Sequence, residues 1–164
     1  MHKRPICLTV NGRKYEVYVK PNRLLIDVLR EDIGLIGTKR GCGIGDCGTC
    51  TILMDGYPVF SCLVLALEAA GHEILTIESV SNGNELHPLQ QAFIDHGAIQ
   101  CGYCTPGMIL TALSLLIHNP HPTEDDVRLA ISGNLCRCTG YQKIIDAVLS
   151  AAETMRANRV KDQP

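Results

Sequence analysis

Eight of the nine cysteines in this 164-residue chain fall into two groups of four with different spacings. The first group consists of Cys42, Cys47, Cys50 and Cys62, and the second of Cys101, Cys104, Cys136 and Cys138. In the first group C-x4-C-x2-C precedes a lone fourth cysteine, which is the spacing of plant-type [2Fe-2S] clusters. The second group reads C-x2-C, a long gap and C-x-C. Four thiolates in each group predict two metal sites that exchange electrons.

The loop around the first group is rich in glycine, with Gly41, Gly43, Gly45 and Gly48 beside or between its cysteines. Glycine adopts positive φ at low cost, so this loop can turn its backbone N–H groups towards an anionic centre. An oxidised [2Fe-2S] cluster with four thiolates carries a net charge of about −2, which inward N–H groups would offset. Without the cysteines, the same glycines would indicate an ordinary flexible connector.

Three other uses of cysteine remain open. Disulfides would suit a small secreted domain, but 46% hydrophobic residues over 164 positions can bury a core without them. Zinc sites usually pair two short C-x2-4-C knuckles, whereas Cys136 and Cys138 are separated by a single residue. A free cysteine can also pack as a small apolar side chain. We assign that role to Cys7, which alternates with Leu8 in an apolar segment.

Composition argues against several classes of function. The formal net charge is −2 and the basic residues are scattered, so no nucleic-acid-binding surface is indicated. The most apolar stretch, Met108 to Ile117, is too short to span a bilayer. The run from Ile6 to Val10 is too short for an export signal, so we expect a reducing, cytoplasmic location. With no tryptophan and 4% aromatic residues, we expect no substrate site on this chain alone.

The patterns in residues 1–78 predict an α+β domain. Apolar residues alternate on both sides of Asn11-Gly12, which predicts a hairpin of strands at 6–10 and 15–19. A helix is expected from Leu24 to Leu29, with Asn22 as its cap and Gly34 at its end. The remaining expected elements are strands at 51–54, 58–60 and 74–77, a turn at Asp55-Gly56 and a short helix at 63–70. Together these elements match a β-grasp ferredoxin.

After a polar linker that starts at Ser79, strand patterns disappear and four helices are expected. They are expected at 88–96 before Gly97, from Thr105 as cap with Pro106 at the first position, from acidic 123–126 to Gly133, and from Gln142 onward. A polar tail is expected at 159–162. The second group of cysteines then lies in the loops of this helical domain.

Three long strings carry a family resemblance: GCGIGDCGTC, QCGYCTPGMI and GNLCRCTGYQKI, in this order. Together they resemble the small iron–sulfur subunit of the molybdenum hydroxylases, the xanthine dehydrogenase and aldehyde oxidase family. The resemblance covers nearly the whole chain. It implies an α+β architecture, with an N-terminal β-grasp plant-type ferredoxin domain at 1–78 and an all-α four-helix [2Fe-2S]-binding domain at 79–164. Each domain would hold one cluster through its four cysteines.

The resemblance also implies a role and partners. The chain would be the iron–sulfur subunit of an oxidoreductase complex whose large subunit holds a molybdopterin cofactor and oxidises the substrate. Its two clusters would pass electrons onward, commonly to a medium subunit that binds FAD. A dimer of heterotrimers is expected. Some relatives fuse all three parts, whereas a chain of 164 residues resembles the separate bacterial subunit.

In the family the C-terminal cluster lies nearest molybdenum. The glutamine before CGYC and the last cysteine of CRC contact the pterin, which implies these roles for Gln100 and Cys138. From the sequence alone, Gln100 could equally be a polar loop residue that satisfies turn N–H groups. Thr49 stands where relatives usually carry alanine. Its hydroxyl could bond a cluster sulfur, or it could bond the backbone.

Two alternative functions remain open at this stage. A zinc-stabilised interaction module would have no redox role and no colour. A free-standing ferredoxin would share the clusters but would act as a monomer that shuttles between enzymes. The substrate of the complex and the terminal electron acceptor are not written in this chain, because the deciding pocket lies on another subunit.

Overall fold

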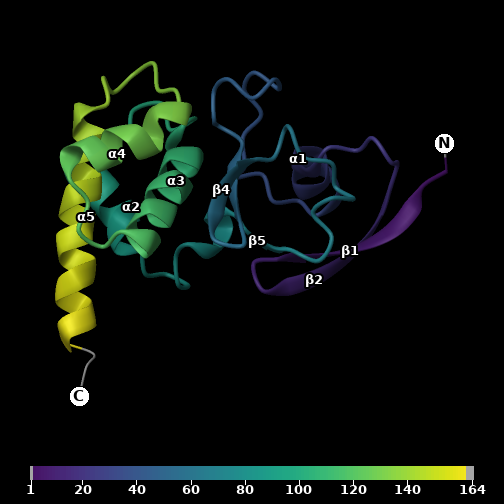
Figure 1. Cartoon of the computed structure of the whole chain (residues 1–164), viewed down its shortest axis with the longest axis horizontal. Helices are drawn as coiled ribbons and strands as arrows, with labels where there is room; N and C mark the ends of the chain where they lie inside the picture. Colours follow the sequence, from purple (N-terminus) through teal and green to yellow (C-terminus); the bar gives the residue numbers. More distant parts are fainter. Residues whose placement is uncertain (1, 162–164) are drawn as a thin grey trace.

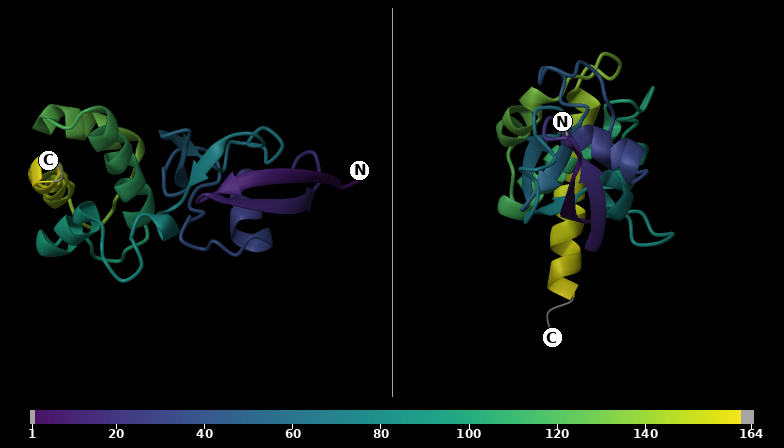
Figure 2. Two further views of the ribbon diagram at one scale, coloured as in Figure 1. Left: turned by 90° about the horizontal axis from the view of Figure 1, so that it is seen from below. Right: turned by 90° about the vertical axis from the view of Figure 1, so that its right-hand side faces the viewer.

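The computed structural model describes residues 2–161, which form two parts that lie side by side (Figure 1). One part contains the five strands and the other contains the long helices. The N-terminus lies at the end of the sheet part that is furthest from the helices, as Figure 2 shows. The expected α+β architecture, with a sheet domain followed by a helical domain, is confirmed.

The sheet part contains five strands. They are β1 (Arg4–Val10), β2 (Arg13–Val19), β3 (Thr51–Met54), β4 (Tyr57–Phe60) and β5 (Glu73–Leu75). The strand order is β2-β1-β5-β3-β4, with β1 parallel to β5 and the other neighbours antiparallel. The expected hairpin turns at Asn11-Gly12 and Asp55-Gly56 are present, and all four residues have positive φ.

A short helical segment packs against the sheet. Helix α1 (Leu25–Asp27) continues into the π-helical turn η1 (Val28–Asp32). Leu25, Val28 and Leu29 of this segment form one core with residues of β1, β3 and β5. The expected cap at Asn22 is wrong, because the residue before the helix is Leu24, which makes no capping bond through its side chain.

The short helix expected at 63–70 is also wrong, since this segment consists of bends, an isolated β-bridge at Leu65 and turns. Its backbone N–H groups bond outside the pattern of a helix. Leu65 donates to the Glu68 carboxylate at 3.1 Å, and Ala66 donates to the Arg23 carbonyl at 2.9 Å. The strand expected at 74–77 ends at Leu75, and Ile77–Ser79 forms a single 3₁₀ turn, η2.

The helical part contains the four expected helices. They are α2 (Pro88–Asp95), α3 (Thr105–His118), α4 (Glu124–Ala130), which continues into the 3₁₀ turn η3 (Ile131–Gly133), and α5 (Gln142–Lys161). Helix α4 begins with the expected acidic turn, and Thr123 and Asp126 form a reciprocal capping box. Thr105 is the first residue of α3 rather than its cap, which is Cys104.

The two parts share a packed interface. Leu53 of β3 belongs to the core of the helical part, together with side chains of α2, α3, α4 and α5. Ser114 of α3 donates a hydrogen bond of 2.7 Å to the Gly56 carbonyl, and the ring of His118 stacks on Tyr57 with centroids 4.7 Å apart. The boundary between residues 78 and 79 stays a prediction, although the sheet and helical parts occupy the expected ranges.

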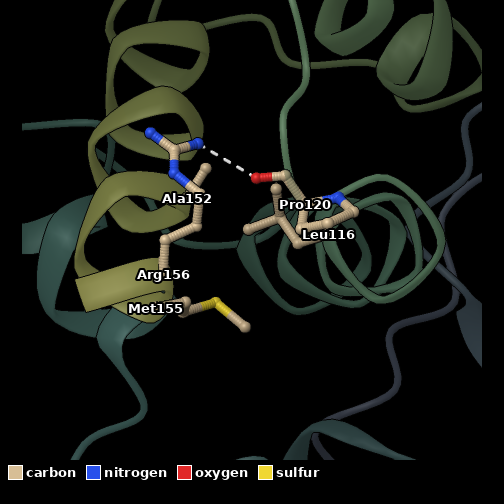
Figure 3. A pocket seen from close by; sticks show the side chains of 5 residues that line it. All are labelled: Leu116, Pro120, Ala152, Met155 and Arg156. Atoms are coloured by element: carbon tan, nitrogen blue, oxygen red, sulfur yellow. Dashed lines mark hydrogen bonds between the residues drawn. The ribbon is translucent and has the colours of Figure 1, made fainter. Parts of the chain in front are cut away.

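Helix α5 runs along the outside of the helical part. Near its end, Arg156 donates a hydrogen bond of 3.0 Å to the Pro120 carbonyl beside a small apolar pocket (Figure 3). The expected polar tail is partly wrong, because residues 159–161 continue α5, while Asp162 lies outside the described residues. Within residues 2–161, no helix is long and apolar enough to cross a membrane.

Asn11 connects the β1–β2 turn to the segment after β5. Its side-chain oxygen accepts hydrogen bonds from the Thr76 backbone N–H at 2.8 Å and from the Ser79 hydroxyl at 2.9 Å. Its amide donates to the Thr76 hydroxyl at 2.9 Å. Asn11 has a φ of 54°, a conformation that glycine also adopts easily.

We therefore predict that Asn11→Gly lowers the free energy of unfolding by about 1–3 kcal/mol, because the turn is kept while its partners lose their bonds. Denaturant unfolding of the whole chain measures this change. Lys14→Ala, on the exposed face of the same hairpin, is the control and should stay within about 0.5 kcal/mol of wild type. Equal stability of Asn11→Gly and wild type would contradict the role of this side chain.

Candidate metal centres

Cys42, Cys47 and Cys50 of the first group lie in the loop between η1 and β3. The fourth, Cys62, lies in the turn after β4. Cys50 and Cys62 are 2% and 3% exposed and pack with Ile26. Cys42 is exposed and Cys47 is half-buried. The group therefore has one dry side against the sheet part and one side near the surface.

The exposed side of this group is lined by backbone N–H groups. The Cys42 sulfur accepts hydrogen bonds from the N–H groups of Ile44 at 3.4 Å and Asp46 at 3.2 Å, and the Cys42 N–H donates to the Cys47 sulfur at 3.3 Å. Gly43 and Gly45 have positive φ and turn these groups inward. The N–H of Ile44 is the largest cause that lowers the pKa of Cys42, to about 6.

On the buried side of this group the cysteine pKa is shifted in the opposite direction. Burial raises the pKa of the Cys50 thiol to about 12. A buried thiol of this kind loses its proton only when a cation takes the proton's place, and metal ligation supplies that cation. These cysteines therefore fit an anionic cluster. On its exposed side, backbone N–H groups would offset the negative charge, and on its inner side the buried thiolates of Cys50 and Cys62 would bind the metal.

The second group lies in two loops of the helical part. Cys101 and Cys104 precede α3, while Cys136 and Cys138 lie between η3 and α5. The sulfurs of Cys101 and Cys138 are 3.6 Å apart, and both residues are exposed.

The other pair of this group is less exposed. The Cys104 thiol interacts with the Cys136 thiol, and burial raises the pKa of Cys104 to about 12. At Cys136 burial acts in the same direction, but the Thr139 hydroxyl donates to the sulfur at 3.1 Å and the pKa is lowered overall. Loops far apart in sequence thus bring the four sulfurs together.

Each group consists of two pairs of interacting thiols. The pairs are Cys42 with Cys47, Cys50 with Cys62, Cys101 with Cys138, and Cys104 with Cys136. A [2Fe-2S] cluster takes two cysteines on each of its two irons, so paired sulfurs fit it. Within residues 2–161, no three His, Cys, Asp or Glu side chains converge as a site for a single ion. All nine cysteines are free, so the disulfide interpretation is wrong.

The loops of the two groups touch each other. The Leu135 N–H donates to the Cys47 carbonyl at 2.9 Å, and the Tyr103 hydroxyl donates to the Arg40 carbonyl at 2.6 Å. Both loops lie at the same edge of the molecule, the upper edge of Figure 1, where the first is blue and the second yellow-green. The residue after Leu135 is Cys136, so one backbone segment links the two candidate sites.

Comparison with known proteins supports both sites. The model of a "2Fe-2S iron-sulfur cluster binding domain" matches residues 8–76, and that of a "[2Fe-2S] binding domain" matches residues 76–149. The nicotinate dehydrogenase small FeS subunit of Eubacterium barkeri is 50% identical over 93% of this chain and 98% of its own length. The chain belongs to the small [2Fe-2S] subunits of the molybdenum hydroxylases.

Solved structures agree with the assignment of this iron–sulfur subunit. A chain of quinoline 2-oxidoreductase from Pseudomonas putida 86 superposes with a TM-score of 0.91 and 51% identity, over 96% of this subunit and 98% of that chain. Aldehyde oxidoreductase from Desulfovibrio desulfuricans ATCC 27774 gives a TM-score of 0.90 and 44% identity, but the match covers only 17% of that chain. The subunit thus corresponds to a small part of a much longer relative.

Membership of this family decides between the alternatives left open by the sequence. Both matching models describe [2Fe-2S]-binding domains, so the iron–sulfur subunit is not a zinc-stabilised module. Its relatives are named as subunits of dehydrogenases and of an aldehyde oxidoreductase, which sets aside the free-standing ferredoxin.

The structure places Gln100 beside Cys138. The Gln100 amide donates a hydrogen bond of 3.0 Å to the Cys138 carbonyl, and both residues are exposed. The sequence suggested these two residues as one site but gave no sign that they contact each other. In this subunit Gln100 links the loop before α3 to the loop before α5.

The Thr49 hydroxyl is close to both kinds of partner considered for it, a cysteine sulfur and a backbone carbonyl. It is 3.3 Å from the Cys47 sulfur and 3.3 Å from the Lys39 carbonyl, and the side chain is 6% exposed. A hydroxyl has one hydrogen, so it donates to one of the two at a time.

Cys7 is exposed, so its assignment to core packing is wrong. Cys7 faces the opposite side of β1 from the buried Leu8 and lies across from Glu16 in β2. It takes no part in either group of cysteines.

Sequence reasoning missed three residues that join the sites: Tyr103, Asn134 and Leu135. All three lie within the quoted strings CGYC and GNLCRC, so their positions were visible. Their partners, Arg40, Gly48 and Cys47, lie more than sixty residues away in the chain, and no local pattern indicates such contacts.

Gly48 allows the loops to approach closely. It has a φ of +67°, and a Cβ at this position would lie 2.3 Å from the Gly133 carbonyl oxygen. Gly43 in the same loop has a φ of +73° and open space around it. The two glycines therefore share a left-handed backbone and differ in packing.

We predict that Gly48→Ala destabilises the subunit more than Gly43→Ala. Both variants bear the cost of a left-handed backbone, about 1–2 kcal/mol. The clash should add roughly 1–3 kcal/mol at Gly48 and lower the iron bound per chain. Denaturant unfolding and iron analysis measure these effects. Equal losses for the two variants would show that the loops do not pack as described.

Proposed function

We propose that this iron–sulfur subunit carries electrons from a molybdopterin-bearing large subunit, through two [2Fe-2S] clusters, to a flavin or another acceptor on a further subunit. The first cluster would be held by Cys42, Cys47, Cys50 and Cys62, and the second by Cys101, Cys104, Cys136 and Cys138. Each cluster, when bound, would accept and release one electron at a time.

The observation that carries this proposal is the hydrogen bond between Leu135 and Cys47. It gives the two sites a short connection through one backbone segment, as a relay between two redox centres requires. Each site also has an exposed end. Cys42 is exposed at the first site, and Cys101 and Cys138 are exposed at the second. An electron can therefore enter at one site and leave at the other.

The direction of transfer follows from the family resemblance. Gln100 and Cys138 would face the pterin of the large subunit, and the exposed loop around Cys42 would face the acceptor. The contact between Gln100 and Cys138 supports this orientation, because it presents a side-chain amide at the exposed end of the second site. The complex would be a dimer of heterotrimers with a medium flavin-binding subunit.

The first test is the cluster content of the purified chain. We predict about four iron and four sulfide per chain, and two distinct paramagnetic signals after reduction. Cys62→Ser should disturb the signal of the first site and Cys136→Ser that of the second. Metal analysis that finds zinc, or a single signal at full occupancy, would overturn the proposal.

Cys7→Ser is the matched control, because Cys7 is a free cysteine outside both groups. It should leave both signals intact. Loss of a cluster in this variant would mean that the ligands are wrongly sorted.

The second test concerns direction and uses the assembled complex. Gln100→Ala keeps all proposed cluster ligands but removes the hydrogen bond to the Cys138 carbonyl. This loss should cost about 1 kcal/mol, which corresponds to a decrease of roughly fivefold in the rate of electron transfer or in retention of the molybdenum cofactor. Iron content should hold. Rapid-freeze paramagnetic resonance during turnover follows both signals.

Thr49→Ala is the control, since Thr49 lies at the first site. It should leave reduction of the second site by substrate nearly unchanged. If Gln100→Ala behaves as wild type while Thr49→Ala slows reduction of the second site, then the first site faces molybdenum and the proposed direction is reversed.

A further inference from the structure

Asn134 is a buried polar residue at the point where the two candidate sites meet. Its side chain is bonded at both ends, and the residue is 3% exposed. The amide donates to the Gly48 carbonyl at 2.8 Å and lies 3.1 Å from the Thr51 hydroxyl, while its oxygen accepts from the Thr111 hydroxyl at 2.9 Å. One side chain thus contacts the first cysteine loop, β3 and α3.

The backbone around Asn134 leaves no room for other side chains. A Cβ on Gly107 of α3 would lie 2.5 Å from the Gly48 carbonyl oxygen and 3.2 Å from the Asn134 amide nitrogen. A Cβ on Gly48 would lie 2.3 Å from the Gly133 carbonyl oxygen. Three backbone segments therefore converge at this point, and Asn134 satisfies the Gly48 carbonyl that they bury.

The two residues that follow Asn134 connect the two candidate sites. The N–H of Leu135 donates to the Cys47 carbonyl, and Cys136 follows directly. The path from the Cys47 sulfur to the Cys136 sulfur then runs through the backbone of one intervening residue and one hydrogen bond. The other bridge, from Tyr103 to Arg40, is longer, because it passes through a phenol ring and the backbone of Gly41.

We propose that Asn134 is a positioning residue that sets the rate of electron transfer between the two clusters, by holding the Leu135 N–H against the Cys47 carbonyl. The inference rests on the proposed function, in which Cys47 and Cys136 are ligands of different clusters. Asn134 touches neither sulfur in the described contacts, so it acts through the backbone that it fixes.

The test uses the full chain with both clusters bound. Photochemical reduction supplies less than one electron per chain, and rapid-freeze paramagnetic resonance follows the redistribution of that electron between the two signals. Asn134→Ala removes the bonds to Gly48, Thr51 and Thr111, and Asn134→Ser replaces the amide by a shorter side chain with a single hydroxyl. Both variants should keep both clusters and their separate signals, while redistribution becomes several-fold slower.

Ser114→Ala is the matched control. It breaks another hydrogen bond between the two parts, a partly buried one to the Gly56 carbonyl, but touches neither cysteine loop. It should lower stability and leave the redistribution rate at the wild-type value. A wild-type rate in the Asn134 variants, or an equal slowing in Ser114→Ala, would overturn the proposal.

Different results would contradict the proposed function and the positioning role of Asn134. Absence of redistribution in the wild-type chain would count against the proposed function itself. If neither Asn134 variant binds two clusters, Gly107→Ala decides, because its added methyl group separates the same segments from the helix side. Slower redistribution in Gly107→Ala supports the positioning role, and a wild-type rate contradicts it.

Discussion

The constraint on which the structure depends is electrostatic: a four-thiolate cluster carries net negative charge and must be held in a partly dry site. The chain meets this constraint with two different devices at the first group of cysteines. On the exposed side, inward backbone N–H groups lower the pKa of Cys42 to about 6. On the inner side, burial raises the pKa of Cys50 to about 12, so its thiolate is stable only beside a cation. The glycines of the loop are needed because a backbone without left-handed residues could not turn its N–H groups inward.

A second constraint is distance, since a relay works only if its two sites are close. The sheet and the helices therefore pack directly on each other, with Leu53 buried among the helices and Ser114 bonded to the β3–β4 turn. The first loop meets the second where glycines allow their backbones to touch. The hydrophobic cores of the sheet part and the helical part thus support cysteine-bearing loops that contact each other.

The sequence predicted the features that depend on neighbours in the chain. The cysteine spacings, the hairpin turns and the four helices all follow from local patterns, and the structure contains them. The segment at 63–70 has apolar residues at helical spacing, yet the Ala66 N–H bonds the distant Arg23 carbonyl, which a local pattern cannot show. Cys7 is a different case. Strand alternation already placed it opposite the buried Leu8, so its exposure was readable from the sequence.

The junction of the two loops could not be predicted, because it joins segments that are more than eighty residues apart, as in the bond from Asn134 to Gly48. Buried asparagine in a loop reads from the sequence as an ordinary turn residue. Its role becomes visible only when the partners on the sheet and on α3 are known.

The most direct test of this account is the low-temperature paramagnetic resonance spectrum of the fully reduced chain. If two clusters lie on either side of the bond from Leu135 to Cys47, their spins must interact. We therefore expect each signal to split or broaden when the other cluster is also reduced. Two signals that simply add, with the same shapes as in chains with one reduced cluster, would contradict the central claim that the two sites are joined at this point.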